Sequence, residues 1–261
     1  MRSRPLAVFI AALIFSSPAC TPKDEPTCRG QAVRLIRPDV LTVGTDFAFP
    51  PFAFDHPETG EPAGFDVELA DAIADQLGLK VLLVNRTSGA LIPGLLAERH
   101  DLAASALIDR PRLRGEVCLS EPYLPAHLGL LTKAVDPPPV ADSGDLSGRA
   151  IGVVRGSRGE AWLRQHLEAG TRIVRLEASD DLAPAVREGA IDAAIDDLPA
   201  VEHAVAGVND LAVTDTIETP DRYVLAAAPN NFGLITLVNE ALEKLKANGK
   251  IRTLQRRWFG R

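Results

Sequence analysis

The strongest constraint on the fold of this chain is a β-α-β-α-β pattern that occurs twice. The first copy alternates three predicted strands with two predicted helices, at 41–45, 66–77, 80–85, 90–99 and 101–107. The second copy repeats that order at 150–154, 160–168, 172–176, 182–188 and 191–195. Such alternation predicts parallel strands joined by right-handed crossovers. The sequence therefore predicts an α/β protein with two similar lobes, each a mostly parallel sheet flanked by helices.

Two further apolar segments are predicted to be strands that cross between the lobes. The first, 128–131, lies between the two copies, and the second, 223–228, follows the second copy. Two crossings of this kind make a hinge, and a cleft then separates the lobes. The predicted boundaries are 38–129 plus 224–261 for lobe 1 and 130–223 for lobe 2.

The first 19 residues are predicted to be a signal peptide. Arg2 and Arg4 precede an apolar run at 6–15 that is too short to span a bilayer, and small residues follow it. Cys20 stands directly after Ala19 and looks like the lipidated cysteine of a bacterial lipoprotein, while ordinary cleavage after Ala19 is the alternative. We expect residues 20–37 to be a lipid-anchored tether, and the mature protein to lie in the periplasm or at the cell surface.

The three cysteines form an odd set for an oxidising compartment. If Cys20 carries a lipid, Cys28 and Cys118 remain as a candidate disulfide between the N-terminal segment and lobe 1. Two unpaired thiols are the alternative interpretation.

The segment 42–54, TVGTDFAFPPFAF, holds four of the nine phenylalanines in the chain. Pro50 and Pro51 exclude a helix here, so the segment is a loop that follows the first strand. Its rings either pack as core beneath the loop or form an aromatic wall at a binding cleft. We favour the cleft for Phe49 and the core for Phe47 and Phe54.

Polar side chains follow several other predicted strands, and ligands of open α/β sheets bind beyond the carboxyl ends of the strands. Together these positions offer hydroxyls, carboxylates, arginines and aromatic rings, which suits a small polar organic molecule with an apolar part. The predicted ligand-binding residues are Asp46, Phe49, Phe52, Ser105, Arg112, Ser157 and Asp197, with Ser88, Arg110 and Asp196 as further candidates.

Composition and motifs argue against several other classes of function. The net charge is −7 and no block of Lys or Arg stands out, which argues against a nucleic-acid partner. The sequence has no cluster of Cys and His at metal-binding spacing, no G-x-S-x-G and no P-loop, and its five histidines are scattered. We therefore expect no catalysis, no cofactor and no metal.

An ordered set of motifs resembles the periplasmic amino-acid-binding proteins of ABC importers, the family-3 extracellular solute-binding proteins. The motifs are TVGTDFAFPPFAF, GFDVELADAIADQLG, LIPGLLAERHDLAAS, SEPY, DLSGRAIGVVRGS, GAIDAAIDDLP and ALEKLKANGKIRTLQRRWFG. The resemblance implies the two-lobe type II periplasmic-binding-protein fold with two hinge crossovers. It also implies a monomer that captures an amino acid or a related compound in the cleft and delivers it to the permease of an ABC importer.

The resemblance also assigns roles to individual residues. Asp46 and Phe49 would line the side-chain pocket, Asp197 would hold the ligand ammonium, and Ser157 after Gly156 would bind its carboxylate. The first-lobe carboxylate clamp of the family is a Thr followed five residues later by an Arg.

This chain departs from that clamp, because an ungapped alignment puts Ile108 and Leu113 at its two positions. If Asp109 caps the following helix, Arg112 takes the clamp position, with Arg110 and Arg114 as alternatives. A second departure is Ser88, which stands near the place of a pocket aromatic.

Two other functions stay open on the same scaffold. One is an enzyme like the cyclohexadienyl dehydratases, which resemble these binding proteins and need a general acid in the cleft. The other is a stand-alone ligand sensor.

Overall fold

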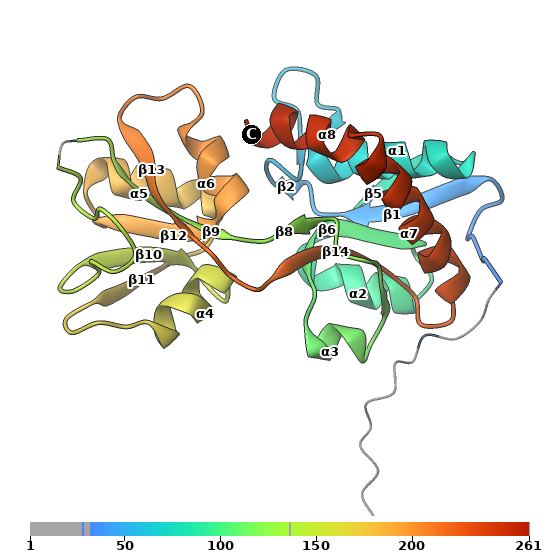
Figure 1. Ribbon diagram of the computed structural model, residues 1–261, viewed down its shortest axis with the longest axis horizontal. Coiled ribbons are helices and arrows are strands. Elements are labelled where there is room, and N and C mark those ends of the chain that lie inside the picture. Colours follow the sequence, from blue (N-terminus) through green and yellow to red (C-terminus); the bar gives the residue numbers. More distant parts are fainter. Residues whose placement is uncertain (1–27, 29–31, 136, 261) are drawn as a thin grey trace, which may run out of the picture.

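The computed structural model describes Cys28 and residues 32–135 and 137–260. Two α/β lobes lie side by side and are joined by two extended connections (Figure 1). The predicted signal peptide and Cys20 lie outside the described residues. Within the described part, no helix is both long enough and apolar enough to cross a membrane.

Lobe 1 is built on a mixed sheet. Its strands run in the order β5 (Lys80–Asn85), β1 (Val40–Thr45), β6 (Leu102–Ile108), β14 (Arg222–Ala227) and β7 (Cys118–Leu119), and β8 (Leu124–Pro125) also pairs with β14. Its helices are α1 (Phe65–Leu77), α2 (Ser88–Leu96), α3 (Pro111–Arg114), α7 (Phe232–Ala247) and α8 (Lys250–Phe259). The aromatic loop forms a small separate sheet of β2 (Ala48–Phe49), β3 (Ala53–Asp55) and β4 (Pro62–Ala63).

Lobe 2 repeats the arrangement with its own sheet. The strand order is β11 (Arg172–Leu176), β10 (Ala150–Val154), β12 (Ala193–Asp197), β9 (Leu128–Lys133) and β13 (Leu211–Ile217). The helices are α4 (Arg158–Gln165), the 3-10 turn η1 (Ser179–Asp181), α5 (Leu182–Glu188) and α6 (Leu198–Val205). No element was predicted at the positions of α6 and β13.

The predicted duplication is confirmed, and the sheets differ from the prediction in one respect. The first strand of each copy pairs in parallel with the other two, as β1 does with β5 and β6, and β10 with β11 and β12. Each sheet then continues with antiparallel strands, β14 beside β6 and β9 beside β12. The sheets are mixed because the segments that cross between the lobes return as antiparallel strands.

Each connection between the lobes lies a few residues before the predicted lobe boundary. Leu128 and Gly129, predicted in lobe 1, pair with β12 of lobe 2. Arg222 and Tyr223, predicted in lobe 2, pair with β8 of lobe 1. The connections between the lobes are therefore residues 126–127 and 218–221, at the centre of Figure 1.

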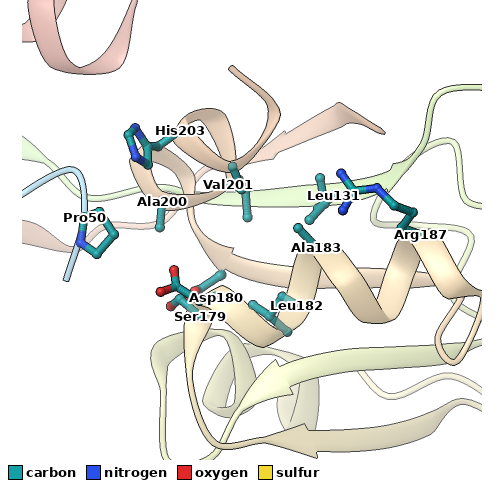
Figure 2. A pocket seen from close by; sticks show the side chains of 12 residues that line it. Pro50, Leu131, Ser179, Asp180, Leu182, Ala183, Arg187, Ala200, Val201 and His203 are labelled. Carbon is teal, nitrogen blue, oxygen red and sulfur yellow. The ribbon is translucent and has the colours of Figure 1, made fainter. Parts of the chain in front are cut away.

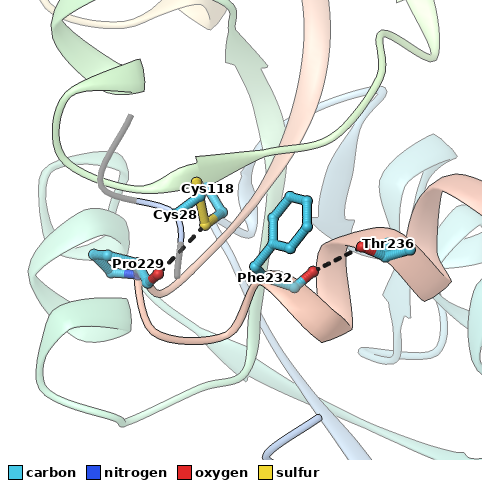
Figure 3. The surroundings of a disulfide bond; sticks show 5 residues. All are labelled: Cys28, Cys118, Pro229, Phe232 and Thr236. Carbon is cyan, nitrogen blue, oxygen red and sulfur yellow. Dashed lines mark hydrogen bonds between the residues drawn. A yellow bond between two sulfur atoms is a disulfide. The ribbon is translucent and has the colours of Figure 1, made fainter. Parts of the chain in front are cut away.

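A disulfide joins Cys28 to Cys118 with their Cα atoms 5.4 Å apart, and it lies beside Pro229 and Phe232 at the start of α7 (Figure 3). The chain that follows Cys28 also binds to lobe 1, since the Ile36 N–H donates to Asp101 Oδ1 at 2.8 Å. The predicted tether therefore does not extend to residue 37, because its last residues are fixed to the first lobe.

Candidate functional site

A cavity of about 650 Å³ lies between the lobes, and both lobes contribute to its walls. Lobe 1 supplies residues of the aromatic loop, α2, the end of β6, and α3. Lobe 2 supplies the residues that follow β10 and the last residue of β12. The lining residues are Phe49, Ser88, Gly89, Ile92, Pro93, Leu96, Ser105, Ala106, Leu107, Ile108, Arg110, Arg112, Leu113, Glu116, Gly156, Arg158 and Asp197.

The fold brings these residues together because parallel strands carry their carboxyl ends to one edge of a sheet. Six of the ten predicted ligand-binding residues lie on the cavity wall: Phe49, Ser88, Ser105, Arg110, Arg112 and Asp197. The remaining four predicted residues do not line this cavity, and each is engaged elsewhere in the structure.

Phe49 and Phe52 share one aromatic cluster but have different environments. Phe49 is half-buried on the cavity wall, and its ring stacks on that of Phe52 with centroids 5.5 Å apart. Phe52 is 0% exposed and also packs against Tyr223 and Phe259. The prediction of a ligand contact at Phe52 is therefore wrong, because this ring belongs to the core that supports Phe49.

Phe47 and Phe54 were expected in the core, and both are instead half-buried. The ring of Phe54 meets Trp258 edge-on, with centroids 5.8 Å apart, and lies 5.9 Å from the His203 ring of lobe 2. Phe54 therefore packs at a contact between the lobes.

Asp46 binds the start of α2 instead of lining the cavity. Its Oδ2 accepts hydrogen bonds from both the N–H and the hydroxyl of Ser88, each at 2.7 Å. Its Oδ1 accepts a third from the Ala48 N–H at 3.2 Å. A carboxylate at a helix N-terminus satisfies a free N–H and complements the helix dipole. Asp46 therefore positions Ser88, which itself faces the cavity.

Ser105 is held at the wall by a buried polar network that the sequence analysis did not identify. Its hydroxyl accepts a hydrogen bond from the Asp46 N–H at 3.2 Å. The next residue, Ala106, has a φ of 46° and donates its N–H to Asp66 Oδ2 at 2.7 Å. Asp66 also accepts from the Tyr123 hydroxyl at 2.8 Å. Burial raises the pKa of Asp66 to about 6.

The arginines near α3 differ in their partners. Arg112 has a side chain that is 92% exposed, and its Nε lies 3.1 Å from Glu116 Oε1. Arg114 pairs with Asp109 and does not line the cavity. Arg110 lines the cavity and has no ionic partner among the described residues. The N-cap of α3 is Arg110 and not the predicted Asp109, whose carboxylate binds Arg114 instead.

Ser157 caps α4 and does not line the cavity. Its Oγ accepts a hydrogen bond from the Glu160 N–H at 3.2 Å, and Glu160 Oε2 accepts one from the Gly156 N–H at 2.7 Å. This bond, together with those from Arg164 and Arg175, lowers the pKa of Glu160 to about 2. Ser157 therefore acts as a helix cap in this structure, and its predicted ligand contact stays a prediction.

The largest difference from the predicted site is Arg158, which the sequence analysis did not select. Its side chain is 8% exposed, and its guanidinium directly contacts the carboxylate of Asp197, which is 10% exposed. Burial raises the pKa of Asp197, and the charge of Arg158 opposes that rise. No local pattern indicates this pair, because the two residues are far apart in the chain and only the packing of α4 on β12 brings them together.

Asp196 faces a different cavity from that of Asp197, since successive residues of a strand point to opposite faces. It accepts a hydrogen bond from the Ser179 hydroxyl and lines a smaller cavity in lobe 2, of about 260 Å³. Figure 2 shows Ser179 on one side of that cavity and His203 on another, with Pro50 of lobe 1 at its edge. Burial, with the neighbouring charge of Asp197, raises the pKa of Asp196 to about 7. Asp196 therefore does not line the larger cavity, and its predicted role in ligand binding stays a prediction.

Two similar lobes, two connections and a cavity walled by both lobes define a two-lobe solute-binding protein with the type II periplasmic-binding fold. The model of the family "Bacterial extracellular solute-binding proteins, family 3" matches residues 41–261. The chain therefore belongs to this family.

Individual relatives agree with that assignment. The chain is 28% identical to the L-cystine-binding protein TcyJ of Escherichia coli (strain K12), over 84% of this chain and 82% of the relative. Among solved structures, an ancestral arginine-binding protein bound to arginine is similar at 27% identity and a TM-score of 0.73, covering 85% of this chain and 98% of that one. An ancestral amino-acid-binding protein that preceded cyclohexadienyl dehydratase is equally similar, at 27% identity and a TM-score of 0.73, covering 85% and 95%.

Proposed function

We propose that this protein captures a small organic ligand, an amino acid or a related carboxylate, in the cavity between its lobes and delivers it to the permease of an ABC importer. The observation that carries this proposal is a cavity of about 650 Å³ whose walls come from the strand ends of both lobes. A ligand that contacts both walls stabilises the closed arrangement of the lobes, because only the closed form makes both sets of contacts.

The proposal is tested by measuring thermal stability and small-angle X-ray scattering with a library of amino acids, amines and organic acids. A ligand should raise the melting temperature and reduce the radius of gyration. Ile92 is half-buried on the cavity wall, so Ile92→Trp should fill the space and remove both effects. The matched control is Leu167→Trp, at an exposed position of lobe 2 outside the cavity. If no compound shifts the wild-type protein, the proposed function fails.

We also propose that the protein binds its ligand without chemical conversion. The carboxylates that line the cavity, Glu116 and Asp197, are each in contact with an arginine, so neither stands as a free general acid. The similarity to a precursor of cyclohexadienyl dehydratase makes prephenate the substrate to test. We expect no phenylpyruvate after incubation with prephenate, and its appearance would reverse the assignment.

We further propose that the mature protein is a monomer anchored by lipid at Cys20. Metabolic labelling with a palmitate analogue should mark the wild-type chain and leave Cys20→Ala unlabelled. Label on neither protein, with a mature N-terminus at residue 20, would identify ordinary cleavage after Ala19. Light scattering after size-exclusion chromatography should give the mass of one chain.

A further inference from the structure

Arg158 is the most completely engaged cation of the cavity wall. Apart from its contact with Asp197, its Nε donates to Asp221 Oδ2 at 3.0 Å, and its Nη2 donates to Thr219 Oγ1 at 3.0 Å and to the carbonyl of Ala126. Four of the five guanidinium donors are thereby used. These three partners belong to the two connections between the lobes. Arg158, at the start of α4, is therefore fixed by residues of the hinge.

A buried carboxylate in a ligand cleft can pair with a ligand ammonium. The carboxylate of Asp197, however, is already in contact with Arg158. A ligand ammonium that approached Asp197 would have to share the carboxylate with a guanidinium that is fixed by four hydrogen bonds, and the two cations would repel each other. Displacement of the guanidinium would deprive Asp221 of its ion-pair partner and leave the Ala126 carbonyl with the hydrogen bond from the Thr219 hydroxyl alone. The charge of Asp197 is therefore already neutralised by a cation of the protein itself.

Among the described residues, Glu116 is the other carboxylate on the cavity wall, and it is a weak partner for a ligand ammonium. Glu116 is paired with Arg112 at the solvent-exposed rim, where the side chains are 41% and 92% exposed. Exposed ion pairs contribute little because water screens both charges. A cationic ligand therefore meets no unpaired carboxylate on the wall that the structure describes.

The remaining features of the wall suit an anion with an apolar body. Arg110 is the one charged lining residue without an ionic partner in the described part of the chain. Around it the lobe 1 wall is apolar, with Phe49, Ile92, Leu107 and Leu113. The cavity wall holds three arginines and two carboxylates. The partner of Arg158, Asp221, lines a neighbouring cavity instead.

We propose that this cleft selects an organic acid with an apolar side chain, and that an ammonium group on the ligand contributes nothing to its affinity, because Arg158 already neutralises the charge of Asp197. This inference rests on the proposed function and makes Arg158 its specificity-determining residue. It separates this chain from the relatives whose names state that they bind arginine or cystine.

The test uses sets of three compounds that share a side chain and differ only in their charged groups. The benzyl set is L-phenylalanine, 3-phenylpropanoate and 2-phenylethylamine, and the isobutyl set is L-leucine, 4-methylpentanoate and 3-methylbutylamine. The guanidinopropyl set is L-arginine, 5-guanidinopentanoate and agmatine. In isothermal titration of the wild-type protein, we expect each acid that binds to do so at least as tightly as its amino acid, and the amines to bind about a hundredfold more weakly or not at all.

A second measurement uses Arg158→Thr, which frees Asp197. This variant should shift the preference toward the amino acid of the set by about tenfold or more, because the ammonium gains a buried partner. Adding Asp197→Asn should cancel that gain. Arg155→Thr is the matched control, since Arg155 precedes Arg158 by three residues and its side chain is 60% exposed. It should leave the preference unchanged.

The outcomes separate the two proposals. Wild-type binding of an amino acid about tenfold tighter than the matching acid overturns the role of Arg158 and leaves the transport function standing. The same holds for an unchanged preference in a folded Arg158→Thr variant. If that variant does not fold, as circular dichroism would reveal, the wild-type series alone decides. If no compound in these sets or in the wider library binds, the proposed function fails and the inference fails with it.

Discussion

The two lobes share a topology and contribute different side chains to the same cavity. In lobe 1 the wall is mainly apolar, and the acid that follows the first strand, Asp46, binds the start of a helix behind it. In lobe 2 the wall is charged, and the acid at the end of the third strand, Asp197, faces the cavity with Arg158 in contact. Each carboxylate is satisfied within the protein, one by a helix N-terminus and one by a guanidinium.

The fold therefore determines where a strand ends, but it does not determine which partner the residue at that end binds. The ends of β1 and β10 are equivalent positions in the two sheets. The first leads into an aromatic loop, and the second leads directly into a capped helix. A duplicated fold therefore supplies two faces to a cleft, and side-chain pairing decides which functional groups remain for a ligand.

The largest expected effect concerns the aromatic cluster behind the lobe 1 wall. Phe52→Ala should lower the free energy of unfolding by about 3–5 kcal/mol, because it empties a fully buried site. Phe49→Ala should cost roughly 1 kcal/mol in stability and weaken ligand binding, since this ring is half-buried on the cavity wall. Urea unfolding and titration calorimetry measure the two effects. Equal losses of stability would contradict the assignment of Phe52 to the core and Phe49 to the wall.

The next effect is a contrast in pH dependence between the lobes. The pKa of Asp66 is raised to about 6 in the folded protein, so the folded state binds an extra proton and stability falls as pH rises from about 4 to about 6. Asp66→Asn should remove that fall, which is on the order of 2–3 kcal/mol. The pKa of Glu160 is lowered to about 2, so the stability it contributes is present above about pH 4.5 and is lost as pH falls toward 2.

Unfolding curves across pH 2–8 for the wild type, Asp66→Asn and Glu160→Gln test this contrast. Each variant is compared with the wild type, so the contribution of Asp196 cancels. Glu160→Gln should be less stable than the wild type at neutral pH and should approach it in acid. Parallel curves for all three proteins would show that neither carboxylate titrates as its surroundings predict.

Substitution of the two helix caps at the cleft should have the smallest effects. Asp46→Ala and Ser157→Ala should each lower the free energy of unfolding by about 1 kcal/mol, because each removes the acceptor for an N–H near a helix start. Both should leave ligand affinity nearly unchanged, since neither side chain lines the cavity. A large loss of affinity with little loss of stability would restore the ligand contacts that the family resemblance implies.

Much of the fold could be predicted from the sequence because it depends on local patterns. Strands at 80–85, 150–154 and 172–176 and a helix at 182–188 have the predicted bounds. Alternating strands and helices also require crossovers that place the strand ends at one edge, so six of the ten candidate residues do line the cavity. The position of the cleft follows from these patterns, whereas the family was recognised from an ordered set of motifs.

The sequence alone determined the two-lobe α/β design, the position of the cleft and the class of residue at each strand end, because periodicity and turn residues act within a few positions of the chain. The tertiary structure decided how these residues are used. It buried Phe52 behind Phe49, turned Asp196 away from the cavity and brought Arg158 to Asp197. The physical reason is that burial and charge pairing depend on packing between distant segments, and no local pattern records which side chain will meet a given carboxylate.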